Sequence, residues 1–156
     1  LVFFGFTSCP DVCPTTLSVM TRAMKLLGDL AEGVQPIFIS VDPERDTPEQ
    51  LKEYLGFFDP RIIGLRGSVA ATKRTVELFR AQYRFVPTVE DGDYTVDHTA
   101  SFYLLGPEGE FVTKFAYGMT AAEVADRLRG YLTGESDLET LPLPDSAASG
   151  IFDRDR

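Results

Sequence analysis

Short apolar segments alternate with amphipathic segments along the first 133 residues, and this alternation limits the chain to a small set of folds. Residues 1–6 form a continuous apolar run, as in strands that are covered on both faces. Apolar side chains then recur at helical spacing within residues 13–31. Further strands and helices follow in the order β-α-β-α-β-α-β-β-α. This order predicts one α/β domain whose central sheet has helices on both faces.

The other expected elements are bounded by capping and turn residues. Thr47, Pro48 and Gln50 form the pattern of a capping box with proline at the first helical position. Residues 106–109 (GPEG) are typical of a hairpin turn. In chain order, the remaining predicted elements are a strand at 36–41, a helix from 48 to about 57, a strand at 62–65, a helix from 69 to about 83, a loop or small hairpin at 87–97, strands at 99–105 and 110–116, and a helix from 121 to about 133.

Composition narrows the functional class. With 156 residues, of which 44% are apolar and 25% are charged, the chain has the make-up of one globular domain rather than of a disordered protein. The net charge of −9 disfavours nucleic acid as a partner, because an acidic surface repels phosphate. No apolar run approaches the roughly 20 residues that a membrane-spanning helix requires.

Both ends of the sequence differ from its middle. The sequence opens inside an apolar run, without a Met, a basic segment or a cleavage site, so we expect a further segment to precede Leu1 and to carry any signal or anchor. Residues 134–156 contain two prolines and six acidic residues among small polar ones. We therefore expect a folded domain at residues 1–133 and, at residues 134–156, a flexible acidic tail or a loosely docked extension.

The only two cysteines, Cys9 and Cys13, lie where the first strand runs into the first helix. Two cysteines cannot form a disulfide framework, so they indicate a local thiol site. The free N–H groups and the dipole of a helix N-terminus favour the thiolate. Residues four apart on a helix have Cα atoms about 6 Å apart, which permits either a disulfide or two sulfurs on one metal ion. The alternative is a pair of small buried core residues.

His98 is the only histidine, and it comes directly before the strand predicted at residues 99–105. Taken alone, a single histidine is more often a surface or structural residue. In a thioredoxin-like arrangement, however, the residue that enters this strand faces the turn that carries the thiols. His98 would then point at Cys9 and Cys13.

Four segments of the sequence, in order, resemble the Sco/SenC family of copper proteins. They are residues 4–15 (FGFTSCPDVCPT), 40–48 (SVDPERDTP), 93–99 (DYTVDHT) and 103–111 (YLLGPEGEF). A CxxxC motif alone is a weak signal, but its combination with DxxxD and a distant Asp-His pair is specific. The resemblance extends from residue 1 to about residue 133.

This resemblance implies a thioredoxin-like fold and one copper ion bound by Cys9, Cys13 and His98. Two thiolates suit Cu(I) and the imidazole makes Cu(II) tolerable, although the same ligands would also suit zinc. The implied partner is the copper-receiving subunit of cytochrome c oxidase, with other copper carriers or thiol reductants as further partners. The implied location is the bacterial periplasm, with an inner-membrane anchor in the preceding segment, or the mitochondrial inner membrane facing the intermembrane space. We expect the domain itself to be monomeric.

Three aspartates near these motifs each have two interpretations. Asp97 could orient His98, or it could be a turn residue. Asp42 and Asp46 could shape the site from a neighbouring loop, as the family motif implies, or Asp46 could serve only to start the next helix. Two methionines on the apolar face of the first helix, Met20 and Met24, are expected in the core.

Three functions compete for the cysteine pair. The first is a copper metallochaperone that passes the ion by ligand exchange to a dinuclear site on the oxidase. The second is a thiol–disulfide oxidoreductase in which Cys9 and Cys13 are the redox pair that reduces cysteines of the target. The third is a peroxidase, because residues 12–15 (VCPT) resemble a peroxiredoxin. A peroxiredoxin has threonine three residues before its reactive cysteine, and here that position holds Pro10 or Phe6, so the third function is strongly disfavoured.

Overall fold

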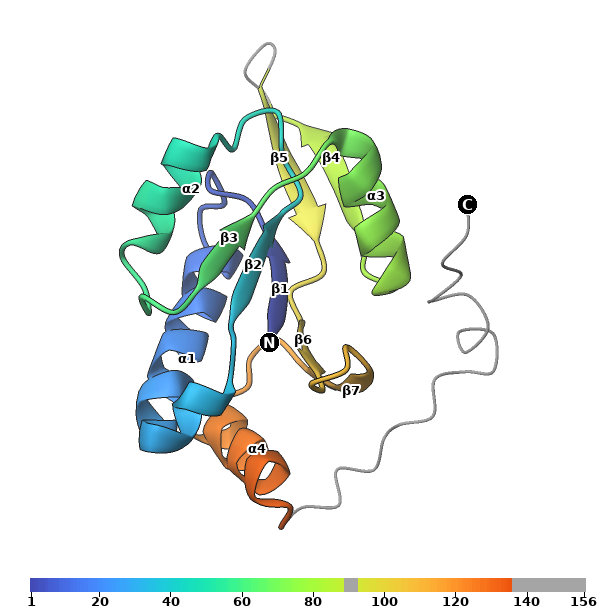
Figure 1. Ribbon diagram of the computed structural model, residues 1–156. Helices are drawn as coiled ribbons and strands as arrows, with labels where there is room; N and C mark the ends of the chain where they lie inside the picture. The colour runs from blue at the N-terminus through green and yellow to red at the C-terminus, as the bar shows by residue number, and fades with distance from the viewer. Residues whose placement is uncertain (89–92, 136–156) are drawn as a thin grey trace.

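A five-stranded mixed sheet forms the centre of the computed structural model, which describes residues 1–88 and 93–135. Its strand order is β3-β2-β1-β6-β7 (Figure 1). β1 (Val2–Gly5), β2 (Ile37–Ser40) and β3 (Ile63–Leu65) run parallel to one another. β6 (Phe102–Leu105) is antiparallel to both β1 and β7 (Phe111–Phe115). β1 is therefore the middle strand, and every residue of it is buried, as its continuous apolar run predicts.

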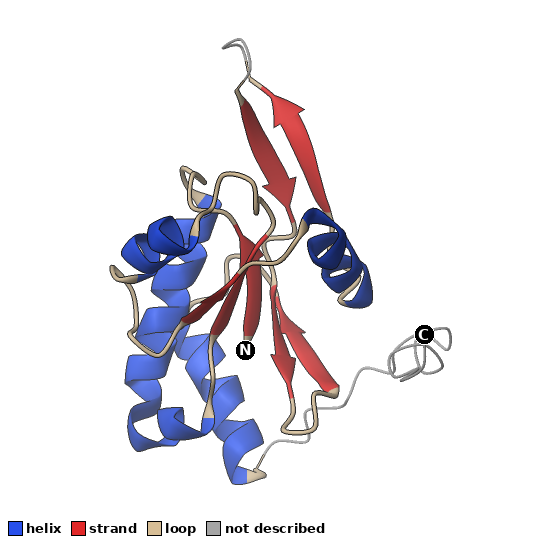
Figure 2. Ribbon diagram, turned by 45° about the horizontal axis from the view of Figure 1, so that its top comes forward, coloured by secondary structure: helices blue, strands red, loops and turns tan. Residues whose placement is uncertain are grey.

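Helices cover both faces of this sheet (Figure 2). α1 (Val12–Leu27), α2 (Pro48–Leu55) and α4 (Ala121–Thr133) lie on one side, and α3 (Val69–Leu78) lies on the other. The ring of Phe38 on β2 packs against Tyr54 of α2, whereas Phe4 on β1 packs against Phe79 at the end of α3. The predicted α/β fold with a central mixed sheet and helices on both faces is confirmed.

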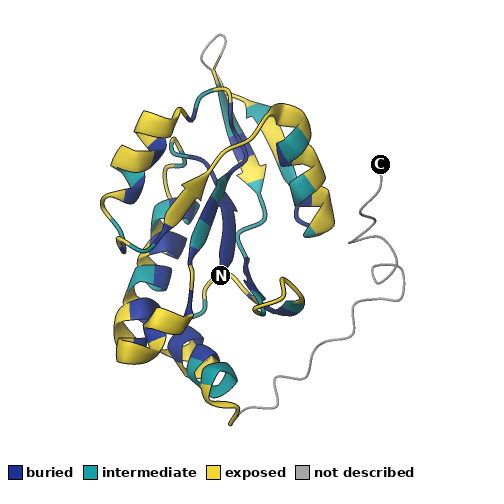
Figure 3. Cartoon of the chain, in the orientation of Figure 1, coloured by how far each residue is buried: buried dark blue, intermediate teal, exposed yellow. Residues whose placement is uncertain are grey.

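The apolar core lies between the sheet and the helix layer that α1 dominates (Figure 3). Met20 and Met24 are among its fully buried members, so their prediction as core residues is confirmed. Capping boxes start α2 at Thr47 and α4 at Thr120. In each box the threonine hydroxyl accepts a hydrogen bond from an N–H that the first helical turn leaves without a partner.

The helix predicted from residue 69 to about residue 83 is too long. α3 ends at Leu78, and Arg80 has left-handed backbone (φ 51°), which a continuing helix cannot contain. The chain then becomes extended as β4 (Tyr83–Pro87), in which aromatic residues recur at the period of a strand. The strand-like alternation of these side chains therefore outweighs the helical spacing on which the longer helix was predicted.

A two-stranded sheet separate from the main one is formed by β4 and β5 (Tyr94–His98). The hairpin alternative for residues 87–97 is therefore correct for the described residues, whereas its tip at residues 89–92 lies outside them. His98 is the last residue of β5 and pairs with Tyr83. The prediction that His98 leads directly into the next strand is wrong, because β6 begins only at Phe102.

The first helix is shorter than predicted. α1 ends at Leu27, where Gly28 has a positive φ of 59°, and a 3-10 segment (Gly28–Gly33) follows. At the other end of the chain, α4 ends at Thr133. Apart from residues 134 and 135, the predicted acidic tail at residues 134–156 lies outside the described part of the structure.

Candidate metal site

The thiol half of the site is built where β1 leaves the sheet and α1 begins. Cys9 lies in the turn between them, and Cys13 lies in the first turn of α1. Both are free thiols. Cys13 is fully buried, whereas Cys9 is half-buried and accepts a hydrogen bond from the backbone N–H of Cys13 at 3.3 Å. The less buried of the two sulfurs is thus the one that receives a hydrogen bond from a helix N–H.

The two thiols differ strongly in acidity. The hydrogen bond from the Cys13 side chain is the main cause that lowers the pKa of Cys9 to about 4, with further help from His98 and backbone N–H groups. Burial is the main cause that raises the pKa of Cys13, and the neighbouring Cys9 thiolate adds to it. At neutral pH Cys9 is therefore a thiolate and Cys13 is a thiol that donates to it.

The imidazole half of the site comes from the end of β5. His98 Nε2 lies 3.1 Å from Cys13 Sγ, and Nδ1 lies 3.1 Å from the carbonyl oxygen of Thr99. A carbonyl can only accept, so this contact places a proton on Nδ1, and Nε2 is the ring nitrogen that faces the sulfur. The rings of Phe3 and Phe6 meet the imidazole edge-on, each with a centroid distance of 5.8 Å. The histidine is thus oriented by a backbone oxygen and two core aromatics.

The structure brings the three predicted ligands together. One donor atom from each of Cys9, Cys13 and His98 lies within 4.8 Å of the other two. Metal–sulfur and metal–nitrogen bonds of about 2.0–2.3 Å would let one ion reach all three after small side-chain adjustments. The donor set, two soft sulfurs and one imidazole nitrogen, fits copper or zinc and does not fit calcium or magnesium, which prefer oxygen.

Close packing under the thiols leaves no room for a larger residue at Gly5. A Cβ there would lie 2.9 Å from Cys13 Sγ and 2.7 Å from Cε2 of Phe38. Both distances are shorter than real carbon contacts allow, so glycine is required for the approach of Cys13 to β1. The thiol half is therefore held by the packed core.

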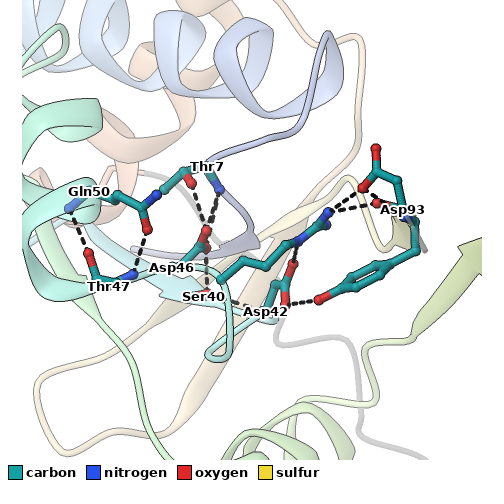
Figure 4. A network of polar contacts seen from close by, with 9 residues as sticks. Thr7, Ser40, Asp42, Asp46, Thr47, Gln50 and Asp93 are labelled. Carbon is teal, nitrogen blue, oxygen red and sulfur yellow. Dashed lines mark hydrogen bonds and ion pairs between the residues drawn. The ribbon is translucent and has the colours of Figure 1, made fainter. Parts of the chain in front are cut away.

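Asp46 ties the thiol turn to the loop after β2 (Figure 4). Its buried carboxylate accepts hydrogen bonds from the hydroxyl of Thr7 at 2.6 Å, the backbone N–H of Thr7 at 3.2 Å and the hydroxyl of Ser40 at 2.6 Å. Helix capping is done by Thr47 and Gln50 instead. Thr7 lies two residues before Cys9. Of the two interpretations of Asp46, the structure therefore favours the one in which it shapes the site.

Asp42 ties the same loop to the strand that carries His98 (Figure 4). Its buried carboxylate pairs with Arg45 Nε at 2.5 Å and accepts from the Tyr94 hydroxyl at 2.8 Å. Arg45 also donates to the Tyr94 carbonyl and stacks 3.7 Å above the Tyr94 ring. Burial, with the hydrogen bond to Asp42, raises the pKa of Tyr94 to about 12, so the phenol stays a donor. We call Asp42, Arg45 and Tyr94 the clamp.

Asp97 does not act as an orienting group for the histidine. Its exposed carboxylate pairs with Arg84 on β4 at 3.0 Å, and the two ring nitrogens of His98 face Cys13 and Thr99 instead. The orienting role proposed for Asp97 is therefore wrong, because successive side chains of a strand point to opposite sides. Sequence reasoning missed Thr99, since a backbone carbonyl leaves no residue-type signal.

A sequence model of the SCO1/SenC family matches residues 1–133. The chain belongs to the SCO1/SenC family. Among its relatives, the human mitochondrial SCO1 homologue is 40% identical over 137 residues, which cover 84% of this chain and 46% of that protein. Copper-bound ScoI of Bradyrhizobium japonicum is 47% identical, with a TM-score of 0.77 over 83% of this chain and 82% of that one. The thioredoxin-like fold predicted from the family motifs is thus confirmed.

A more distant SCO1/SenC structure is that of BsSco, a member of the Sco family of cytochrome c oxidase assembly proteins for which a disulfide switch has been identified. It is 26% identical, with a TM-score of 0.59 over 85% of this chain and 78% of that one. The chain spans about half the length of the human and fission-yeast SCO1 relatives, 46% and 51% respectively. In residues 1–88 and 93–135, no helix combines the length and the apolar character needed to cross a membrane.

Proposed function

We propose that this chain is a copper metallochaperone that delivers copper to the dinuclear site of cytochrome c oxidase during assembly. The observation that carries the proposal is the convergence of two sulfurs and one imidazole nitrogen within 4.8 Å. Soft thiolates retain Cu(I), and the imidazole extends the site to Cu(II). Zinc would accept the same ligands, but the related ScoI was solved with copper bound, and this favours copper.

The partial exposure of the ligands suits a copper ion that is passed on to another protein. Cys9 and His98 are half-exposed, whereas Cys13 is fully buried. An accepting protein can therefore offer its own ligands at the Cys9 and His98 side and replace them one at a time. The ion keeps a bond throughout, so it is never released into water. Cys13 would then be the last ligand to release the ion.

A thiol–disulfide oxidoreductase is the second candidate function, favoured by the low pKa of Cys9. The Cys9 thiolate would attack one sulfur of a target disulfide and form a mixed disulfide, with the other target sulfur leaving as a thiolate. Cys13 would lose its proton and attack Cys9 Sγ, forming the Cys9–Cys13 disulfide and releasing the second target thiolate. Two electrons pass from the pair to the target, and the disulfide switch identified in BsSco supports this chemistry.

His98→Ala separates the two functions, because thiol exchange needs only the sulfurs whereas the three-ligand site needs the imidazole. The test measures copper per chain after dialysis against a competing chelator, and reduction of a disulfide substrate by the same samples. His98→Ala is expected to lose Cu(II), to retain Cu(I) poorly and to keep disulfide exchange. Cys9→Ala and Cys13→Ala are expected to lose both activities. Full copper retention by His98→Ala in both valences would contradict the three-ligand site and favour the reductase.

The location and assembly implied by the family stay predictions. We propose that the chain works at a membrane that carries cytochrome c oxidase, in the bacterial periplasm or the mitochondrial intermembrane space. We also propose that residues 1–133 are the copper-binding domain, that this domain is monomeric and that the acidic tail is not needed for the site. The human relative, a mitochondrial protein, supports such a location.

A further inference from the structure

Tyr54 of α2 carries a buried hydroxyl close to the metal site. Its ring packs edge-on against Phe58 and at a tilt against Phe38 of β2, with centroids 5.5 and 6.0 Å away. Among residues 1–88 and 93–135, the Tyr54 hydroxyl has no hydrogen-bond partner. A buried hydroxyl without a partner costs free energy, so such groups are rare and often belong to sites that bind an ion or change state.

Core packing connects this phenol to the thiol half of the site. The Phe38 ring, on which Tyr54 packs, and the sulfur of Cys13 meet at one point of β1. A Cβ at Gly5 would lie 2.7 Å from Phe38 Cε2 and 2.9 Å from Cys13 Sγ. One aromatic ring therefore links Tyr54 to the place where Cys13 enters the core.

The acidity of the phenol agrees with this position. Burial is the main cause that raises the pKa of Tyr54. The negative charges that Cys13 and Cys9 carry as thiolates add to this effect, ahead of the charge of Asp46. Because Coulomb energies fall with distance, these groups lie close to the hydroxyl, and Cys13 acts on it most strongly. The phenol therefore keeps its proton at neutral pH and is a hydrogen-bond donor.

Cys13 needs a further donor only when the site holds copper. In the metal-free protein Cys13 is a thiol that donates to Cys9. A cysteine that binds a metal loses its proton, and Cys13 is then a fully buried thiolate. Hydrogen bonds lower the cost of a buried charge. Asp46, the carboxylate near Tyr54, already accepts from two hydroxyl groups, so Cys13 is the acceptor that lacks such a donor.

We propose that the Tyr54 hydroxyl donates a hydrogen bond to Cys13 Sγ when the site holds copper, and that this bond favours Cu(I) over Cu(II). The inference rests on the proposed function and makes Tyr54 a positioning residue that acts on the ion through Cys13. A small rotation of the phenol or a small shift of the sulfur would close the contact. The hydrogen bond withdraws electron density from the sulfur, and Cu(II) depends on that density more than Cu(I) does.

Tyr54→Phe tests the inference, with Tyr131→Phe on α4 as a control at another half-buried tyrosine. Without metal, Tyr54→Phe is expected to melt at the wild-type temperature or above it, because the change removes a buried hydroxyl that has no partner among the described residues. The affinities for Cu(I) and Cu(II) are measured by competition with chelators, together with the redox potential of the bound copper and the wavelength of the sulfur-to-Cu(II) absorption band.

With copper, Tyr54→Phe is expected to lower the ratio of the Cu(I) affinity to the Cu(II) affinity about tenfold, which is a fall of about 59 mV in the copper potential. The absorption band should move to longer wavelength, and Tyr131→Phe should change neither quantity. The inference is overturned if the ratio and the potential of Tyr54→Phe equal those of the wild type, or if its metal-free form melts at a clearly lower temperature. A wild type that retains no copper would contradict the proposed function itself, whereas an unchanged ratio contradicts this inference alone.

Discussion

The two halves of the candidate site are held in different ways. Cys9 and Cys13 lie at the junction of the central strand and the longest helix, where Cys13 is fully buried and touches β1 at Gly5. His98 ends a two-stranded sheet that has no ladder hydrogen bonds to the main sheet within the described residues. The clamp of Asp42, Arg45 and Tyr94 joins the two halves. The comparison teaches that the core holds the thiols directly, whereas the imidazole, oriented by the Thr99 carbonyl and two core aromatics, lies on a strand that a polar clamp joins to the loop after β2.

The largest expected effect concerns the thiol half: Cys9 should be far more acidic than an ordinary cysteine. Because its pKa is lowered to about 4, Cys9 remains a thiolate as the pH falls from 9 to about 5, and alkylation by iodoacetamide should slow only near pH 4. An ordinary cysteine, with a pKa of about 8.5, would be several hundred times less ionised at pH 6. The test is the pH profile of alkylation at Cys9, followed by mass spectrometry. A midpoint near pH 8 would contradict the asymmetry of the two thiols.

Gly5→Ala should damage the thiol half. The added methyl group meets Cys13 Sγ and the Phe38 ring in a packed core, and such overpacking typically costs about 1–3 kcal/mol. We expect a lower free energy of unfolding and weaker copper retention. Gly33→Ala is the matched control, because its Cβ would be in ordinary contact with Leu132 at 3.4 Å. Equal stability of the two variants in denaturant titrations would show that the thiols do not depend on this packing.

Tyr94→Phe should loosen only the imidazole half. It removes the hydrogen bond to the buried Asp42 carboxylate, at an expected cost of about 1–2 kcal/mol, and leaves the rings packed. Copper should dissociate into a chelator severalfold faster, whereas the pH profile of Cys9 alkylation should not change. Tyr117→Phe, at a mostly exposed side chain, is the control. Unchanged copper dissociation despite lower stability would mean that the clamp does not position His98.

Removal of residues 134–156 should have the smallest effect. If the two halves and the clamp are sufficient for the site, the melting temperature and the copper content should stay nearly unchanged. The composition of this segment, rich in acidic and small polar residues, motivates the expectation. A loss of stability above about 2 kcal/mol would show that the segment packs on the domain, because surface changes seldom cost so much.

The thiol half was predictable from the sequence because its signals are local. An apolar strand, a CxxxC pair and a helical repeat follow one another within residues 1–27, and the structure joins them as predicted. The prediction of His98 as the third ligand depended on the fold, and the sequence did not predict in which element His98 lies. The histidine ends β5 rather than entering β6. Its place there depends on its pairing with Tyr83, which lies fifteen positions away in the sequence, so no local pattern predicts it.

The clamp and the orienting group of His98 could not be predicted. Tyr94 donates to Asp42 across 52 positions, and no pattern in either segment announces such a contact. The carbonyl of Thr99 orients the imidazole, and every residue type has a carbonyl. Asp97 was a reasonable candidate by adjacency, but the alternation of side chains along β5 turns it toward Arg84. Long-range polar contacts and contacts with backbone groups are thus the parts of the site that the sequence does not predict.

X-ray absorption of the copper-loaded protein tests most directly the central claim that both halves of the site hold one ion. In the reduced protein the copper edge should report two sulfur neighbours and one imidazole nitrogen, at one copper per chain. His98→Ala should lose the nitrogen signal and keep both sulfurs, whereas Tyr94→Phe should keep all three ligands. Coordination by sulfur alone in the wild type, or an imidazole signal that persists in His98→Ala, would contradict the account.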